Sequence, residues 1–417
     1  MTDKDRSSLP VSRARRVLLA ILIITGALVA VILVRGRSPN VTASVLPSNV
    51  PAEAQPVIKQ HSDNPPPKAN RAATVEICGQ GKIPIEGSDP GAINRHIFEL
   101  AQGAGTRWLS AMQNSDDLRA RLAGLLLEGK ITRGDSLHPI AEQTRDAAVQ
   151  LAAGTVDPAV YAIAMSMCGT YAGTGTDSCQ QISLRRWAQL DPNNAVPWLL
   201  LAGYAHQRHN EADEADAFSR AAKANKVDSY SDSLYAFAES ELPSDVTPLE
   251  RSALAMEVIG VEAASWMPQY GIASQHCSTE AMRDSWIQQQ CNSLADLLVT
   301  KGTNLLDLST GKKIGARAGW SSERVNQLTQ EQSALMQVTL QETPSDNDEL
   351  WTCEGVSRFN AYTVQRARLG EVGADRALLE RSGETVPELA QKFTEYVENI
   401  RRNAMKEEQE SAARSSD

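Results

Sequence analysis

The stretch LDPNNAVPWLLLAGY, Leu190–Tyr204, combines the end of one predicted helix, a tight break and the start of a second predicted helix. The break contains Asp191 and Pro192. The same Asp-Pro pair occurs 34 positions earlier, at Asp157 and Pro158. A repeated helix-turn-helix unit has this length. The stretch therefore predicts paired helices that recur along this part of the chain.

Two amphipathic helices are predicted on either side of the polar break HQRHN. Their apolar positions are Trp198, Leu201 and Ala202 in the first helix and Ala215, Phe218, Ala221 and Ala222 in the second. Small residues allow two helices to approach closely. The period places the small residues Cys168, Ala202 and Ala236 at equivalent positions, next to the larger Met167, Leu201 and Tyr235. These patterns favour stacked helical hairpins.

The first helix resembles that of a tetratricopeptide repeat, with Trp198 and Leu201 in place and Ala202 where the family has glycine. The chain departs from the family pattern at Tyr204, which comes one place early, and by one extra residue in the turn. Asparagine and lysine replace the Asp-Pro pair at the third boundary. The resemblance covers one unit of about 34 residues closely and residues 157–258 loosely. The alternative is an ordinary helical domain that contains one such hairpin.

The resemblance implies a right-handed superhelix, an α-solenoid, whose concave face binds peptides or partner proteins. Stacking of several units is expected because a single hairpin cannot bury its apolar face alone. The positions that the resemblance carries onto the concave face are Val196, Leu199, Gly203 and His206. The competing interpretation is that these four residues pack against a neighbouring helix.

The composition favours an all-α fold, since hydrophobic residues make up 42% of the chain but aromatic residues only 5%. Thr247 and Glu250 in TPLE, and Thr385 and Glu388 in TVPE, have the spacing of capping boxes. The second box predicts the last ordered helix, with a stripe formed by Leu389, Phe393, Tyr396, Val397 and Ile400. Little sheet is expected. Gly311, Gly315 and Gly319 predict a loop or hinge, after which a helix restarts near Ser321.

Residues 17–34, VLLAILIITGALVAVILV, form an apolar run that nearly spans a bilayer core of about 30 Å. A cleaved signal peptide is the alternative, but this run ends in Arg35 and Arg37 rather than at a small-residue cleavage site. Five basic and two acidic residues precede it, which predicts that residues 1–16 stay in the cytoplasm. The prediction is a type II single-pass membrane protein with a signal anchor.

The predicted regions are a cytoplasmic basic tail (1–16), a transmembrane anchor (17–34), a disordered Pro-rich linker (35–73), an N-terminal helical region (74–156), the repeat-like hairpins (157–258), a C-terminal helical region (259–400) and a polar tail (401–417). The formal net charge is −10, and the basic tail accounts for +3, so −13 remains on the rest of the chain. This acidic balance argues against nucleic acid as a partner.

All six cysteines lie on the predicted external side of the anchor, where disulfides form. Cys168 and Cys179 flank a Gly-rich turn, and Cys277 and Cys291 flank a short helical stretch, so these two pairs are expected. Cys78 and Cys353 remain, and joining them is the third expectation.

Motifs for catalysis or cofactor binding are weak. His206 and His209 have the spacing of two metal ligands, but no carboxylate or cysteine pattern completes the site. STGKK from Ser309 lacks the first glycine and the hydroxyl residue of a phosphate-binding loop. Glu239-Ser240 resembles the Glu-Ser pair of lytic transglycosylases but lacks the element that follows it in that family. We therefore assign no catalytic, cofactor-binding or metal-binding residue and expect no cofactor.

The sequence favours an inner-membrane protein of a bacterial envelope, with its folded domain in the periplasm, that binds or scaffolds a protein or peptide partner without catalysis. The alternative is a helical envelope enzyme that acts on peptidoglycan or peptides, with Glu239 as its acid. A third hypothesis is an accessory domain that assembles a larger complex through the anchor.

Overall fold

The computed structural model describes residues 73–85, 91–133, 142–168, 177–264, 270–343 and 347–414. It divides into two compact units, Met1–Arg95 and His96–Asp417. The described residues are mostly helical, which confirms the all-α class. The predicted basic tail (1–16), anchor (17–34) and all but the last residue of the linker lie outside the described residues. Within the described ranges, no helix combines the length and the apolar character needed to cross a bilayer.

The first unit contains a hairpin of two antiparallel strands, β1 (Ala73–Ile77) and β2 (Gly81–Ile85), with Val75 opposite Ile83. The turn needs glycine because Gly79 and Gly81 have φ values of 77° and 76°. The sequence predicts a helical region from residue 74 onward, and this prediction is wrong for residues 74–85, which form the hairpin. Side chains alternate between exposed and buried here, as in a strand. Helix α2 begins at Gly91.

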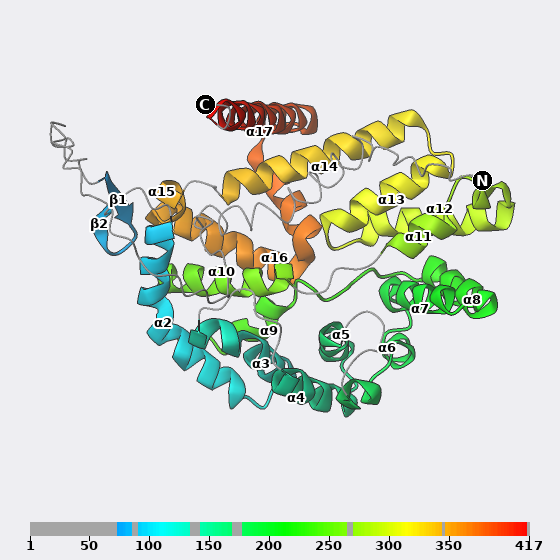
Figure 1. Ribbon diagram of the computed structural model, residues 1–417, viewed down its shortest axis with the longest axis horizontal. Coiled ribbons are helices and arrows are strands. Elements are labelled where there is room, and N and C mark those ends of the chain that lie inside the picture. Colours follow the sequence, from blue (N-terminus) through cyan, green and yellow to red (C-terminus); the bar gives the residue numbers. More distant parts are fainter. Residues whose placement is uncertain are drawn as a thin grey trace, which may run out of the picture. The chain divides into compact units, whose positions relative to one another are not determined.

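Helix α2 (Gly91–Gln113) contains the boundary between the two units at Arg95 and His96. It is followed in the second unit by α3 (Leu118–Arg133) and α4 (Glu142–Ala153). They are drawn in blue to dark green in Figure 1. Trp108 of α2 is fully buried, and its Nε1 donates to the Ala238 carbonyl oxygen at 2.8 Å. This hydrogen bond joins α2 to α9 (Leu234–Glu239), which lies far along the chain.

The predicted helical hairpin is present as α7 (Ala195–Gln207) and α8 (Glu211–Lys223), which pack against each other. Ala202, Phe218 and Ala221 are all fully buried, so small residues do allow the close approach. Before the hairpin come α5 (Pro158–Met167), the short 3-10 helix η1 (Asp177–Gln181) and α6 (Leu184–Leu190). This succession of packed helices is compatible with a helical repeat.

The sequence places Cys168, Ala202 and Ala236 at equivalent positions of three successive helical repeats, and the structure contradicts this prediction for the third repeat. Cys168 and Ala202 are buried, but Ala236 is exposed. It lies on α9, which has only six residues. A helix this short makes fewer than two turns, so it cannot form one half of a hairpin like α7–α8.

The C-terminal helices begin where the capping boxes predict. Thr247 N donates to Glu250 Oε2 at 2.8 Å, and Glu250 N donates back to Thr247 Oγ1 at 3.3 Å. The elements that follow are α10 (Pro248–Ala264), α11 (Gly271–His276), η2 (Ala281–Arg283), α12 (Ser285–Lys301), α13 (Leu305–Arg317), α14 (Ser322–Glu342), α15 (Asn347–Leu350), α16 (Cys353–Ser382) and α17 (Val386–Arg414).

The predicted hinge at Gly311, Gly315 and Gly319 is wrong for its first two glycines, which lie inside α13. A Cβ atom at Gly311 would lie 2.8 Å from the Ala295 carbonyl oxygen of α12, and one at Gly315 would lie 2.3 Å from the Trp320 ring. These glycines serve close packing rather than flexibility. The chain turns at Gly319, where φ is 98°, and α14 restarts with Ser321 as its N-cap, as expected.

Helices α14, α16 and α17 share one apolar cluster, formed by Ala334, Val338, Tyr362, Ala374, Leu378 and Leu389. Helix α16 is kinked at Gly370, whose φ of 73° lies in the left-handed region. A Cβ atom there would lie 2.9 Å from the Thr303 carbonyl oxygen, so glycine is needed for both conformation and space.

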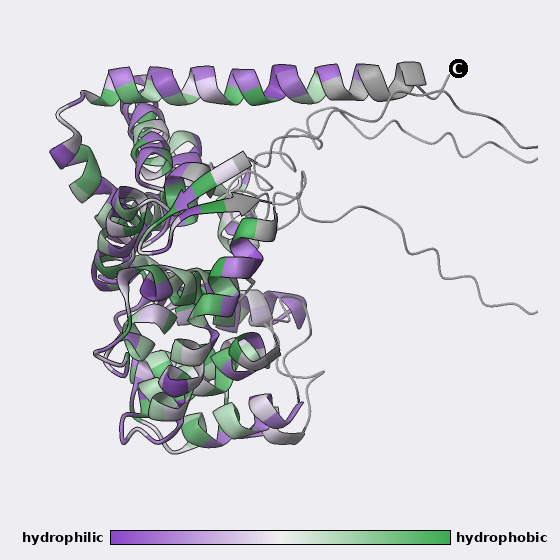
Figure 2. Ribbon diagram, turned by 90° about the vertical axis from the view of Figure 1, so that its left-hand side faces the viewer, coloured by the Kyte–Doolittle hydropathy of each residue, from purple (hydrophilic) through white to green (hydrophobic). Residues whose placement is uncertain are grey.

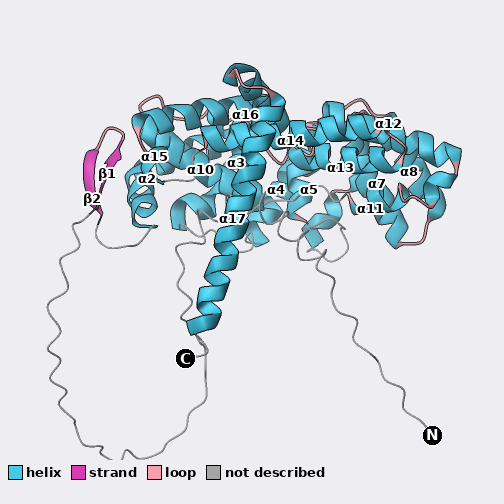
Figure 3. Ribbon diagram, turned by 90° about the horizontal axis from the view of Figure 1, so that it is seen from above, coloured by secondary structure: helices cyan, strands magenta, loops and turns pink. Residues whose placement is uncertain are grey.

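The predicted polar tail, 401–417, is helical through Arg414, because α17 continues well past Ile400. The tail sequence consists largely of Glu, Arg, Lys, Gln and Ala, which are good helix formers. Figures 2 and 3 show α17 reaching away from the helices around α14 and α16. Its first turns carry the buried Leu389, but farther along Ile400 and Met405 are 41% and 48% exposed.

Candidate functional site

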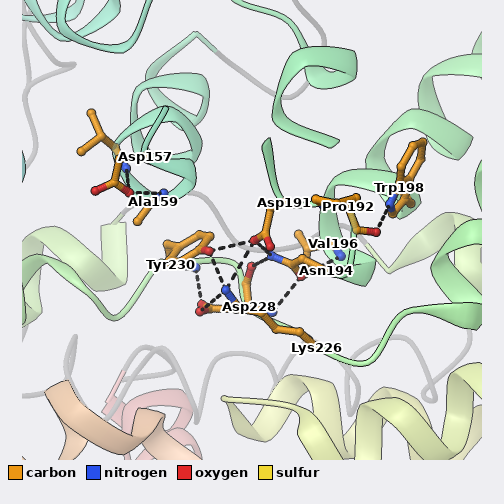
Figure 4. A network of polar contacts seen from close by, with 11 residues as sticks. Asp157, Ala159, Asp191, Pro192, Asn194, Val196, Trp198, Lys226, Asp228 and Tyr230 are labelled. Carbon is orange, nitrogen blue, oxygen red and sulfur yellow. Dashed lines mark hydrogen bonds and ion pairs between the residues drawn. The ribbon is translucent and has the colours of Figure 1, made fainter. Parts of the chain in front are cut away.

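A network of polar contacts joins the loop before α7 to the loop after α8 (Figure 4). Asn194, which is fully buried, caps α7. Its Nδ2 donates to Asp191 Oδ2 at 2.8 Å and to the Asp228 carbonyl oxygen at 2.7 Å. Its Oδ1 accepts from Asp228 N at 3.0 Å. One side chain thus fastens two loops that lie 34 positions apart.

Tyr230 completes this network from a backbone conformation that is rare for a tyrosine, with φ of 59°. Its hydroxyl donates to Asp191 Oδ2 at 2.8 Å and accepts from Lys226 Nζ at 2.6 Å. Burial, together with the hydrogen bond to Asp191, raises the pKa of Tyr230 strongly. These groups hydrogen-bond to one another, so the network holds the two loops together.

A second polar cluster surrounds Arg366 of α16. Arg366 Nη1 donates to Glu262 Oε2 of α10 at 2.7 Å, and its Nη2 lies 3.8 Å from Asp232 Oδ1. Burial raises the pKa of Glu262, and Arg366 only partly offsets this. Burial alone would lower the pKa of Arg366, but Glu262 and Asp232 outweigh it and raise that pKa. Glu371, whose pKa is also raised by burial, accepts from Leu305 N at 2.9 Å.

Two further carboxyl groups in this part of the fold each accept a hydrogen bond from a tyrosine. Tyr362 donates to Asp375 Oδ1 at 2.9 Å, and Tyr270 donates to Asp307. Burial raises the pKa of each carboxyl group to about 7. Such groups exchange protons near neutral pH. However, Asp375 and Asp307 are 0% and 1% exposed, so a substrate atom cannot reach them in this conformation.

The histidines are arranged differently from the predicted pair. His206 Nδ1 lies 3.0 Å from Glu214 Oε2, and the other oxygen of Glu214 lies 3.8 Å from His276 Nδ1. His209 is exposed at the end of α7, with φ of 55°. His276 stacks on Phe218, and burial lowers the pKa of His276 despite Glu214. No group of three potential ligands in the described ranges has the geometry of a metal site.

The residues expected on a concave binding face are instead part of the packing. Val196 and Leu199 are each 2% exposed and Gly203 is buried, so the expectation of a binding face is corrected for these three residues. Their helix, α7, packs against α6, α8 and α11. His206 is half-buried and pairs with Glu214, as described above.

The residues of the weak catalytic motifs make ordinary contacts. Glu239 Oε1 lies 3.9 Å from Arg251 Nη1, with a quarter of its side chain exposed, which is the geometry of a surface ion pair. Lys312, from the STGKK stretch, donates to Gln332 Oε1 at 2.9 Å, and burial lowers its pKa. Neither residue faces a set of groups suited to hydrolysis or phosphate binding.

Two disulfides join the expected cysteine pairs, Cys168–Cys179 and Cys277–Cys291. Cys78 and Cys353 are disulfide-bonded as well, and none of the cysteines is free. The oxidised state of all six is consistent with an extracytoplasmic compartment. The sequence predicts the disulfide partners of Cys168 and Cys277 because each partner lies close by in the chain. It does not predict the contacts of Arg366 and His276, because their partners Glu262 and Phe218 lie far away in the sequence.

No protein-family model matches the chain, and neither the curated proteins nor the solved structures give a significant match.

Proposed function

We propose that this chain is a membrane-anchored envelope protein whose extracytoplasmic helical domain binds a protein partner and is not catalytic. Residues 17–34 would anchor it in the inner membrane, with residues 1–16 in the cytoplasm and the domain in the periplasm. The disulfides support an external domain. The hairpin α7–α8 and its neighbours support a tetratricopeptide-like architecture over part of 157–258.

The observation that carries the proposal is the apolar stripe of α17. Leu389 is buried against α14 and α16, but Phe393, Tyr396 and Val397 of the same stripe are only half-buried. Ile400, the last residue of the stripe, is exposed. Apolar side chains aligned on one face of a helix, with incomplete cover, are typical of a helix that docks onto another protein.

The charges next to the stripe indicate the chemistry of the partner. The segment IRRNAMK, residues 400–406, carries Arg401, Arg402 and Lys406 and no acidic residue. A matching surface would be an apolar groove, or an amphipathic helix, with acidic residues at its rim. This is a helix-in-groove mode of recognition, in which the apolar anchors supply most of the affinity and the rim charges supply orientation.

Site-specific photo-crosslinking in the full-length chain tests the proposal. A photoreactive residue in place of Ile400 should capture one protein, and the same residue in place of Glu398, which is exposed and points away from the stripe, should not. The variant Ile400→Glu, tested with the photoreactive residue at Val397 of the same stripe, should lose the captured protein while its thermal unfolding stays unchanged. Equal capture from both positions, or capture of a second copy of this chain, would contradict the proposal.

A further inference from the structure

A partly open pocket of about 460 Å³ lies among α2, α3 and α4. Its lining residues are Gln113, Arg121, Leu125, Ala147, Gln150 and Leu151. The spacing of these residues explains why they meet. Arg121 and Leu125 are four apart on α3, and the three residues of α4 follow one face of that helix, so two helical faces enclose the space. Its volume lies within the range of small-molecule sites.

Arg121 supplies the only charge among the six lining residues. Its Nε is buried and has no hydrogen-bond partner in the described part of the chain. Because a ligand cannot reach a nitrogen that is closed to solvent, a carboxylate in the pocket would bind through the terminal Nη nitrogens of Arg121. The neighbouring Arg119 is engaged differently, because its Nε donates to Asp157 Oδ2 at 2.6 Å. Of these two arginines on α3, Arg121 is therefore the one that faces a cavity.

The rest of the lining determines what kind of anion fits. Leu125, Ala147 and Leu151 provide apolar walls, and the amides of Gln113 and Gln150 can each donate or accept a hydrogen bond. Free inorganic anions would leave the apolar walls in contact with water. A molecule with one carboxylate and a short aliphatic chain would satisfy both parts of the pocket.

We infer that the pocket formed by α2, α3 and α4 binds a small amphipathic monocarboxylate, with the carboxylate on Arg121 and the aliphatic chain against Leu125 and Leu151. The pocket contains no residue of α17, so ligand binding here can be tested independently of the protein partner proposed above. Arginine suits the task because its planar guanidinium can bind both oxygens of a carboxylate.

Binding of hexanoate to the detergent-solubilised full-length protein tests the inference, with hexanol as a probe of the same chain length without charge. Hexanoate should bind in a calorimetric or ligand-observed NMR titration, and hexanol should bind at least about tenfold more weakly. The variant Arg121→Met keeps the aliphatic stem and removes the guanidinium. It should weaken hexanoate binding by about tenfold to a hundredfold, while the exposed-residue control Arg185→Met leaves binding unchanged.

A second variant separates the cavity from the charge. Ala147→Leu adds bulk to a wall of the pocket without altering Arg121, and it should also weaken hexanoate binding. Circular dichroism should show that both pocket variants remain folded. The inference is overturned if hexanoate does not bind the native protein, if hexanol binds equally well, or if folded Arg121→Met binds hexanoate as the native protein does.

Discussion

Arg366 on α16 and Glu262 on α10 form an ion pair at 2.7 Å in which the two side chains are only 16% and 2% exposed. The pair connects two helices that lie far apart in the sequence, and Asp232 adds a second carboxylate at 3.8 Å. A buried carboxylate that loses its partner keeps its desolvation cost without the compensating attraction. The contribution of this pair can therefore be measured by removing one side at a time.

Arg366→Met should lower the free energy of unfolding by about 3–5 kcal/mol, because Glu262 would remain buried without its cation. Urea unfolding followed by circular dichroism measures the loss. The control Arg368→Met changes an exposed arginine two positions away and should shift stability by less than about 0.5 kcal/mol. Adding Glu262→Leu to Arg366→Met should restore part of the stability. A loss for Arg366→Met no larger than that of the control would contradict this account.

The pH dependence of stability should change in Asp375→Asn. Burial, with Glu371 nearby, raises the pKa of Asp375 from 3.8 to about 7, while Thr339, Tyr362 and Arg366 act in the opposite direction. Between pH 4 and pH 7 the folded state then holds more protons at this group than the unfolded state. The free energy of unfolding that Asp375 contributes therefore falls as the pH rises through this window.

Asp375→Asn removes this titration, so the variant should gain stability relative to the native protein as the pH rises from 5 to 8. Urea unfolding at a series of pH values measures the difference between the two proteins. Glu323→Gln, at an exposed carboxylate in the first turn of α14, serves as the control and should leave the pH profile unaltered. Parallel pH profiles for Asp375→Asn and the native protein would show that the burial argument is incorrect.

Glycine substitutions should distinguish close packing from a hinge in α13. Gly315→Ala should destabilise the protein by about 1–3 kcal/mol, because the new Cβ atom would lie 2.3 Å from the Trp320 ring. Gly260→Ala in α10 is the matched control, since no atom lies within 4 Å of its Cβ position. It should stabilise the helix by about 0.5–1 kcal/mol. Thermal unfolding of both variants gives the comparison, and similar shifts of the same sign would support a hinge instead.

Loss of the Cys277–Cys291 bond should lower stability by about 3 kcal/mol, because the bond closes a loop of moderate length and limits the unfolded chain. The double variant Cys277→Ser/Cys291→Ser tests this in chemical unfolding under non-reducing conditions. Ser278→Ala/Ser293→Ala, next to the bonded pair, provides the control for substitution as such. Equal midpoints for the native protein and the cysteine variant would exclude a stabilising role.

Local features of this protein were determined by the sequence itself. The capping box at Thr247, the contact of Glu388 with Thr385, the restart after Ser321 and the hairpin α7–α8 all depend on residues a few positions apart, whose chemistry acts within one or two turns. The disulfides with short separations, such as Cys168–Cys179, belong to the same class. The helical propensity of the residues was also enough to predict the all-α class.

Only the tertiary structure decided which apolar and charged side chains became buried and what they met. Val196 and Leu199 satisfy a binding-face pattern but are covered by packing, and Gly311 satisfies a hinge pattern but lies inside a helix. Arg366 finds Glu262 across 104 positions. Periodicity shows that one face of a helix is apolar, but the partner of that face depends on how distant helices pack, and burial sets the charge state of Asp375.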